Sequence, residues 1–239
     1  MKAILIGYGE IGKAVFNVFS HDHEIIIHDV AKGIDYIAKN GERAEILIIA
    51  IPYSRHFEKI VKSYQEKFDI KSTLVFSTTQ IGTCKRLKAV HSPVEGKHPN
   101  LAESIETGKR WIGGKDERVM RFFKEAGFKK EQLRVVEKPE FTEFLKLRST
   151  TLYGVNIEFA RYSNEVAREL KMSFEEVRKF DEDYNELYRK MGMPWFARYI
   201  LSPPKGKLGG HCVVPNAKKL KKLFPHSMLN EILKKREDK

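Results

Sequence analysis

Three glycines near the start of the chain have the spacing that binds a dinucleotide. The segment Gly7-Tyr8-Gly9-Glu10-Ile11-Gly12 follows the apolar run 3–6 and opens a predicted helix, Ile11–Phe19. The first glycine permits a tight turn, the second lets a pyrophosphate approach the backbone, and the third lets the helix pack against the strand. The N–H groups at the start of the helix attract the phosphates. We therefore expect residues 7–12 to bind a dinucleotide cofactor.

An acidic residue follows where the cofactor's ribose would lie. A second predicted strand, 24–28, ends at Asp29, about 20 residues beyond the middle glycine. A carboxylate there accepts hydrogen bonds from both ribose hydroxyls and repels a 2′-phosphate, so we expect NAD. Lys32 lies three residues further on and keeps NADP open as an alternative.

Later strands deliver polar residues to the same edge of the predicted sheet. The run 45–51 is continuously apolar, as is typical of a parallel strand buried on both faces, and 72–76 predicts a further strand. Cofactors bind outside the carboxyl ends of such strands. We therefore expect Pro52 and Thr78 to contact the cofactor.

A loop near residue 95 concentrates titratable side chains. A strand over 88–91 ends at His91, and the loop 92–99 holds Glu95, Lys97 and His98. Each histidine is open to two interpretations, an acid or base in catalysis and a solvated loop residue.

The alternation of strands and helices stops near residue 138, which predicts two domains. We expect a Rossmann parallel sheet over 1–138 and an all-helical domain over 139–239. Apolar spacings of three, four and seven predict one long helix at 140–170, followed by a second at 173–190. The long helix carries Lys146, Thr150 and Tyr153 on one face.

Composition sets the class of partner. Lys plus Arg number 44 against 32 Asp plus Glu, a net charge of +12 that is enriched towards residue 239. This charge could attract nucleic acid or an anionic substrate. Because no nucleic-acid motif accompanies it, we prefer a solvated surface and an anionic small-molecule substrate, and a nucleic-acid-binding module is the least favoured alternative. We expect no metal. Two cysteines and the lack of a cleavable leader or membrane-length apolar run predict a cytoplasmic protein without a membrane segment. Abundant Lys, Glu and Ile indicate a thermophilic source.

Several of these motifs together resemble the UDP-glucose/GDP-mannose dehydrogenase family, the nucleotide-sugar dehydrogenases. Gly209-Gly210-His211-Cys212 resembles that family's active-site cysteine segment. The same resemblance covers its NAD fingerprint at 7–12, its Ser-Thr strand end at 77–79, its Pro-Glu loop at 93–95, its Ile-Gly-Gly at 112–114 and its Glu-Leu-x-Lys-Leu helix opening at 143–147. It implies a 6-phosphogluconate dehydrogenase-like plan, NAD, and a homodimer formed through the long helix.

The resemblance also implies roles for individual residues. Such enzymes oxidise a primary alcohol to an acid in two hydride transfers, through a thioester on cysteine. Cys212 would be the nucleophile, Lys146 would stabilise an oxyanion or order a water, and Glu95 would assist proton transfer. Four further residues are expected at the substrate: Thr150, Gly210, His211 and Asn216.

This chain differs from the family pattern at two of those positions and in length. Thr150 stands where the family has asparagine, and Asn216 stands where it has aspartate. The family normally continues into another Rossmann-like domain that binds the nucleotide of the sugar. We expect this chain to be a short form without that domain.

Two other functions remain open. One is a two-electron dehydrogenase similar to the 3-hydroxyacid, 6-phosphogluconate and prephenate dehydrogenases, with Lys146 or His91 as acid or base and no role for Cys212. The other is a non-catalytic NAD-binding protein, in which the catalytic set has changed at Thr150 and Asn216.

Overall fold

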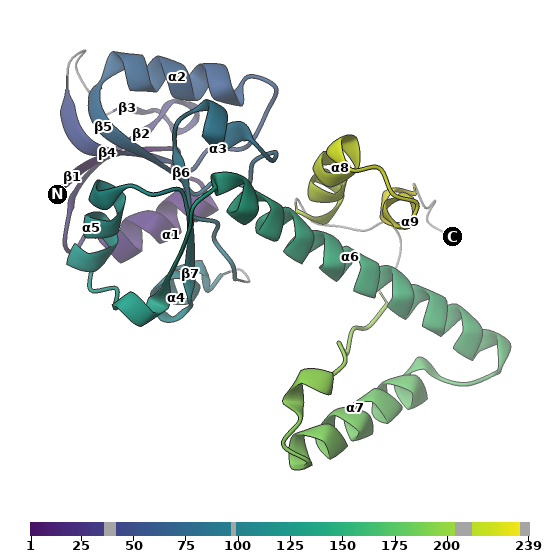
Figure 1. Ribbon diagram of the computed structural model, residues 1–239. Coiled ribbons are helices and arrows are strands. Elements are labelled where there is room, and N and C mark those ends of the chain that lie inside the picture. The colour runs from purple at the N-terminus through teal and green to yellow at the C-terminus, as the bar shows by residue number, and fades with distance from the viewer. Residues whose placement is uncertain (36–41, 97–98, 204–211, 235–239) are drawn as a thin grey trace. The chain divides into compact units, whose positions relative to one another are not determined.

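The computed structural model describes residues 1–35, 42–96, 99–203 and 212–234. It divides the chain into two compact units, residues 1–146 and 147–239 (Figure 1). The fold class is confirmed, since a mostly parallel sheet with helices on its faces is followed by a helical unit. Within the described ranges, no helix is both long and apolar enough to cross a bilayer.

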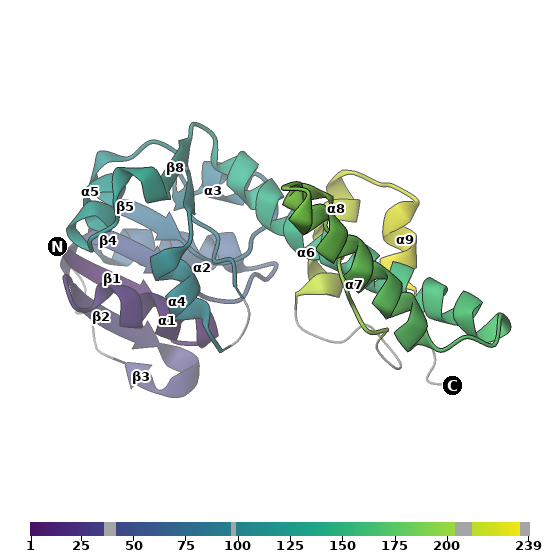
Figure 2. The same ribbon diagram turned by 90° about the horizontal axis from the view of Figure 1, so that it is seen from below.

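The strands of the described residues form one eight-stranded sheet, in the order β3-β2-β1-β4-β5-β6-β7-β8. Figure 2 views this sheet with β3 at one edge and β8 towards the other. The pairs β2–β3 and β6–β7 are antiparallel, and all other neighbouring pairs are parallel. The strands are β1 (Lys2–Ile6), β2 (Glu24–Asp29), β3 (Ile34–Asp35), β4 (Arg43–Ile49), β5 (Asp69–Val75), β6 (Val90–His91), β7 (Arg110–Gly113) and β8 (Leu133–Val136).

Strand order reverses between β1 and β4, because the chain runs from β1 outward to β2 and then returns to pair β4 on the other side of β1. In open parallel sheets, such a reversal leaves a crevice beyond the carboxyl ends of the two strands, and ligands bind there. The glycine loop after β1 lies at this point.

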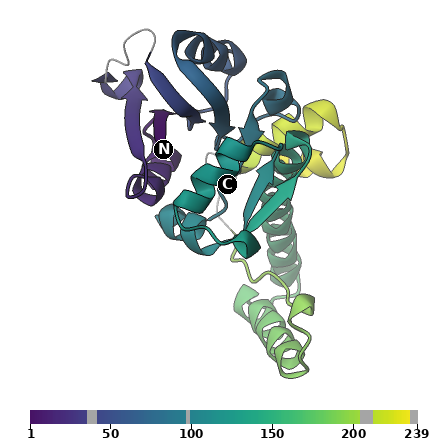
Figure 3. The ribbon, with the colours of Figure 1, turned by 60° about the vertical axis from the view of Figure 1, so that its left-hand side comes forward.

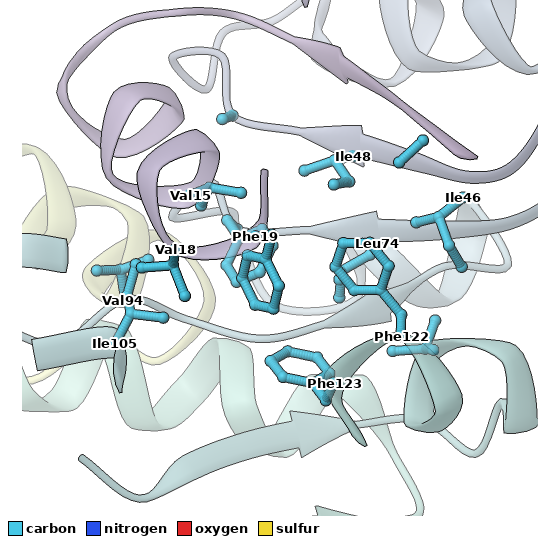
Figure 4. Close-up of a cluster of buried hydrophobic side chains, with 14 of the residues drawn as sticks. Val15, Val18, Phe19, Ile46, Ile48, Leu74, Val94, Ile105, Phe122 and Phe123 are labelled. Atoms are coloured by element: carbon cyan, nitrogen blue, oxygen red, sulfur yellow. The ribbon is translucent and has the colours of Figure 1, made fainter. Parts of the chain in front are cut away.

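Alternating residues of the central strands supply two separate cores, one on each face of the sheet. Successive side chains of a strand point to opposite faces, so Leu5 and Ile48 join one core while Ile4 and Ile49 join the other. The first core packs against α1 (Glu10–Phe19), α4 (Leu101–Thr107) and α5 (Glu117–Glu125), and Figure 4 shows Phe19, Phe122 and Phe123 within it. The second packs against α2 (Phe57–Lys67) and α3 (Thr83–Arg86).

The second unit is built on α6 (Pro139–Glu169), which begins in the first unit, and on α7 (Phe174–Lys190), α8 (Val213–Leu223) and α9 (Met228–Leu233). The predictions of helices at 140–170 and 173–190 are confirmed. Lys171 adopts a left-handed φ of 58°, and Met172 N–H reaches back to Ala167 O at 2.8 Å, which ends α6. α7 then leaves at an angle to α6 (Figure 3).

A small residue of α6 lets α8 and α9 approach it closely. A Cβ on Gly154 would lie 2.5 Å from Val213 Cγ1 and 3.3 Å from Ile232 Cγ2, so no larger residue fits without displacing them. Around this contact, Val213, Ala217, Leu229 and Ile232 form the unit's own hydrophobic core.

Part of the apolar stripe that predicted α6 lies on its surface. Phe159 and Tyr162 are exposed, whereas Glu158 and Arg161 are buried and paired at 3.2 Å. The periodicity therefore predicted the helix correctly, although it does not say which face of that helix the chain itself covers.

Candidate functional site: a dinucleotide loop and a polar sheet edge

The glycine loop after β1 has the backbone that a pyrophosphate site requires. Gly7 has a left-handed φ of 94° and donates its N–H to His28 O at 2.9 Å, which fixes the turn against β2. A Cβ on Gly12 would collide with the Gly7 carbonyl. A Cβ on Gly9 would instead enter open space, with no heavy atom within 4 Å. Gly9 is therefore not required for packing, and the open space beside it is where a phosphate would approach the start of α1.

Asp29 is held beside this loop at the end of β2. Its Oδ2 accepts from Tyr8 N–H at 2.7 Å, and its Oδ1 accepts from Lys32 N–H at 3.2 Å. Lys32 Nζ donates to Tyr8 O at 2.7 Å. Asp29, the predicted acceptor for the ribose, and Lys32, the lysine that keeps NADP open, thus both bind the backbone of Tyr8.

The ends of β4 and β5 form the next part of the edge. Ser77 donates its hydroxyl to Ile51 O at 2.7 Å and so joins the two strand ends. Pro52 is exposed and Thr78 is half-buried, so solvent reaches both residues at these strand ends. Glu10 and Ile11 lie at the start of α1, where Glu10 is exposed and Ile11 is half-buried.

Beyond this edge, a buried carboxylate joins α6 to α3. Glu143 accepts from Thr79 Oγ1 at 2.9 Å, from Gly82 N–H at 2.6 Å and from Cys84 N–H at 2.8 Å. Burial raises the pKa of this carboxyl, and these hydrogen bonds oppose the rise. The sequence placed Glu143 and Thr79 in motifs but gave no sign that they pair, since they are 64 residues apart.

His91 is neither a solvated loop residue nor an accessible base. Its ring is fully buried, with Nε2 3.2 Å from Ser77 O and Nδ1 2.8 Å from Thr142 Oγ1. Because a carbonyl can only accept, Nε2 carries the hydrogen and Nδ1 accepts from the threonine hydroxyl. Burial lowers the pKa of His91 to about 4, with a further lowering from Lys146. His91 is therefore a neutral linker between strand β6 and helix α6, and His98 lies outside the described residues.

Lys146 and Glu95 meet at the loop that follows β6. Lys146 Nζ donates to Val94 O at 2.6 Å and lies 3.6 Å from Glu95 Oε2. The lysine side chain is 13% exposed and that of Glu95 is 50% exposed. This brings together two of the three residues for which the family resemblance implies catalytic roles, with the carboxylate open to solvent.

The third, Cys212, belongs to a separate cluster in the second unit. It is exposed and caps the N-terminus of α8, where the helix dipole favours an anion. One turn later, Asn216 donates its side-chain amide to Thr150 Oγ1 at 3.0 Å and accepts from Lys219 Nζ at 3.0 Å. Burial lowers the pKa of Lys219, and Cys212 opposes this effect. Gly210 and His211 lie outside the described residues.

The fold and the glycine loop define the class: a Rossmann-type α/β unit, with a glycine-rich turn after its first strand, followed by a helical unit. No protein-family model and no curated protein matches the sequence. Solved structures do match the fold. The UDP-D-ManNAc dehydrogenase of Pyrococcus horikoshii superposes with a TM-score of 0.78 at 15% identity, over 98% of this chain and 67% of its own.

Two further solved structures have the same fold. The UDP-glucose dehydrogenase of the hyperthermophilic archaeon Pyrobaculum islandicum has a TM-score of 0.70 at 16% identity, over 97% of this chain and 67% of its own. The 3-hydroxyisobutyrate dehydrogenase of Mycobacterium tuberculosis has a TM-score of 0.70 at 11% identity, over 97% of this chain and 91% of its own. The chain therefore has the two-part fold of these dehydrogenases and spans about two thirds of the length of the nucleotide-sugar enzymes.

Proposed function

We propose that this protein is an NAD-dependent oxidoreductase. The observation that carries the proposal is the loop at residues 7–12, where Gly7 and Gly12 are required by the backbone while the side of Gly9 stays open. An anchored carboxylate, Asp29, lies beside that opening, as an NAD ribose requires. NAD bound there would accept hydride from a substrate carbon.

The preferred substrate class is the primary alcohol of a nucleotide sugar or a similar phosphorylated sugar. In the first oxidation, Glu95 would take the proton of the substrate hydroxyl while bound NAD would take the hydride, which leaves an aldehyde. The Cys212 thiol would then add across the aldehyde carbonyl to give a thiohemiacetal. Loss of its hydroxyl proton, with transfer of the second hydride to a second NAD, would leave a thioester. Water hydrolyses the thioester to the acid and frees the thiol. Lys146 stabilises the oxyanion or orders the water.

One observation favours a second candidate, a two-electron dehydrogenase. Position 216 carries an amide, so the carboxylate expected four residues after the cysteine is missing. In this candidate Lys146 is the acid or base and the sulfur of Cys212 has no role.

The second unit supports the proposal of a homodimer. Several aromatic side chains of its helices are exposed within the single chain, with Phe159 at 67% and Trp195 at 73%. Exposed apolar patches of this kind mark protein interfaces. Light scattering gives the test: we expect a mass of two chains, reduced to one by Phe159→Glu. The matched control is Val30→Glu, at an exposed valine of the first unit, and an unchanged mass in both variants would contradict the proposed interface.

Absorbance at 340 nm tests the enzymatic proposal. Purified protein with NAD is mixed with UDP- and GDP-sugars and with phosphorylated hydroxyacids, and we expect NADH to form with one of these classes. The Gly12→Ala variant serves as the control for the cofactor site. Binding of NADH without turnover on any substrate would favour the non-catalytic alternative.

A further inference from the structure

Arg110 is a buried cation to which the proposed mechanism assigns no role. It is the first residue of β7, is 1% exposed, and is the largest of the fully buried side chains among the described residues. Its Nη2 donates to Pro93 O, and its Nε has no hydrogen-bond partner within the described part of the chain. Among the described residues, this guanidinium of five donors thus has one hydrogen-bond acceptor, the Pro93 carbonyl.

Stability alone does not explain this arrangement. Burial lowers the pKa of Arg110 to about 10, opposed by the charge of Glu95, so the group stays charged at neutral pH. A buried charge costs desolvation energy, and an apolar residue of similar volume often serves stability equally well. We therefore expect the cation to have a role besides packing.

Arg110 acts on the loop that follows β6, at residues 93–95. Pro93 O accepts from Arg110, and the next carbonyl, Val94 O, accepts from Lys146 Nζ at 2.6 Å. Two successive carbonyls of one loop are thus held by two cations, one from β7 and one from α6. Glu95 follows directly, 3.6 Å from Lys146, and its charge acts on Arg110 as well.

Pro93 O and Val94 O belong to neighbouring peptide units that are joined at the Val94 Cα, so two backbone dihedrals alone separate them. Holding the first carbonyl therefore limits the positions that the second, the acceptor of Lys146 Nζ, can reach. We propose that Arg110 is a positioning residue, which holds the Pro93–Val94 peptide so that the Lys146 ammonium and the Glu95 carboxylate keep their mutual geometry. This inference rests on the roles proposed above for Lys146 and Glu95.

A labelling experiment tests the coupling without any substrate. The rate of reductive methylation of Lys146 is measured by mass spectrometry in the full chain, with Lys71, an exposed lysine on β5, as internal reference. In Arg110→Met we expect Lys146 to react at least about fivefold faster, because a freed loop no longer shields it. Arg110→Lys, which keeps a cation below Pro93, should be intermediate. The matched control is Arg134→Met, at an exposed arginine of the neighbouring strand β8, and it should react as the wild type does.

Each outcome decides the proposal. A folded Arg110→Met that labels at the wild-type rate overturns it. If that variant fails to fold, Arg110→Lys decides, and a wild-type rate there overturns the proposal equally.

Once a substrate is known, Arg110→Lys should lower kcat at least about tenfold with little change in the KM for NAD. Failure to find any substrate would contradict the proposed function while leaving the labelling result intact.

Discussion

Asn216 on α8 donates its side-chain amide to the hydroxyl of Thr150 on α6, at 3.0 Å. These are the two positions at which the chain differs from the nucleotide-sugar dehydrogenase pattern, asparagine being expected at 150 and aspartate at 216. In this chain the amide lies on α8 and its partner on α6 is a hydroxyl, so the bond between the two helices involves no carboxylate.

The hydrogen bond between Asn216 and Thr150 should contribute measurably to the free energy of unfolding. Asn216→Ala removes both the donor to Thr150 and the acceptor of Lys219 Nζ in a buried setting, so we expect a loss of about 1–3 kcal/mol in the free energy of unfolding. Urea denaturation measures it. Lys222→Ala, at an exposed position of the same helix, should stay within about 0.5 kcal/mol of the wild type. Equal effects of the two substitutions would contradict the assignment.

Substitutions at Gly12 and Gly9 should have different effects on stability and on cofactor binding. Gly12→Ala places a methyl group against the Gly7 carbonyl, so both the melting temperature and NADH affinity should fall. Gly9→Ala adds a methyl group in open space, so the melting temperature should hold while NADH binds at least about tenfold more weakly (about 1.4 kcal/mol). Thermal unfolding and fluorescence titration with NADH measure the two effects. Undiminished affinity in Gly9→Ala would place the cofactor elsewhere.

Cofactor choice should depend on Asp29 and Lys32. Asp29→Asn removes the charge that repels a 2′-phosphate, so the ratio of NADPH to NADH dissociation constants should fall. Lys32→Ala removes an ammonium from the Tyr8 peptide, and the same ratio should rise. Lys62→Ala, at an exposed lysine of α2, is the control. Movement of the ratio in the same direction in both variants would be incompatible with this assignment.

Acid should destabilise the first unit through His91. Its folded pKa of about 4 lies below the ordinary value of 6.5, so the unfolded chain binds more protons between these values. The stabilisation is complete above pH 6.5 and is lost as the pH falls towards 4. Between pH 7.5 and 5.0 the wild type should lose about 2 kcal/mol more than His91→Gln does. Urea unfolding at the two pH values measures this difference, and parallel losses would show that His91 is not held neutral.

Much of the fold was predictable because its signals are local. Continuous apolar runs predicted β1 and β4, and apolar spacings of three, four and seven predicted the long helix α6. The spacing of Gly7, Gly9 and Gly12 predicted the loop between β1 and α1. The two-residue strand β3 and the four-residue helix α3 were missed, since elements so short contain no full period.

The site was predictable only in part, because several of its contacts are long-range. Lys146 and Glu95 were named through a resemblance of motifs, whereas the burial of Arg110 beneath Pro93 depends on how β7 meets the end of β6. Similarly, His91 was ambiguous because the sequence does not say that α6 covers it with Thr142.

The most direct test of the account is the number of NADH molecules formed per molecule of substrate consumed, measured at 340 nm for the wild type and for Cys212→Ser. We predict two NADH per substrate in the wild type and no acid product in the variant, since only the thioester route needs the sulfur. One NADH per substrate, unchanged by Cys212→Ser, would contradict this account and assign the protein to the two-electron dehydrogenases.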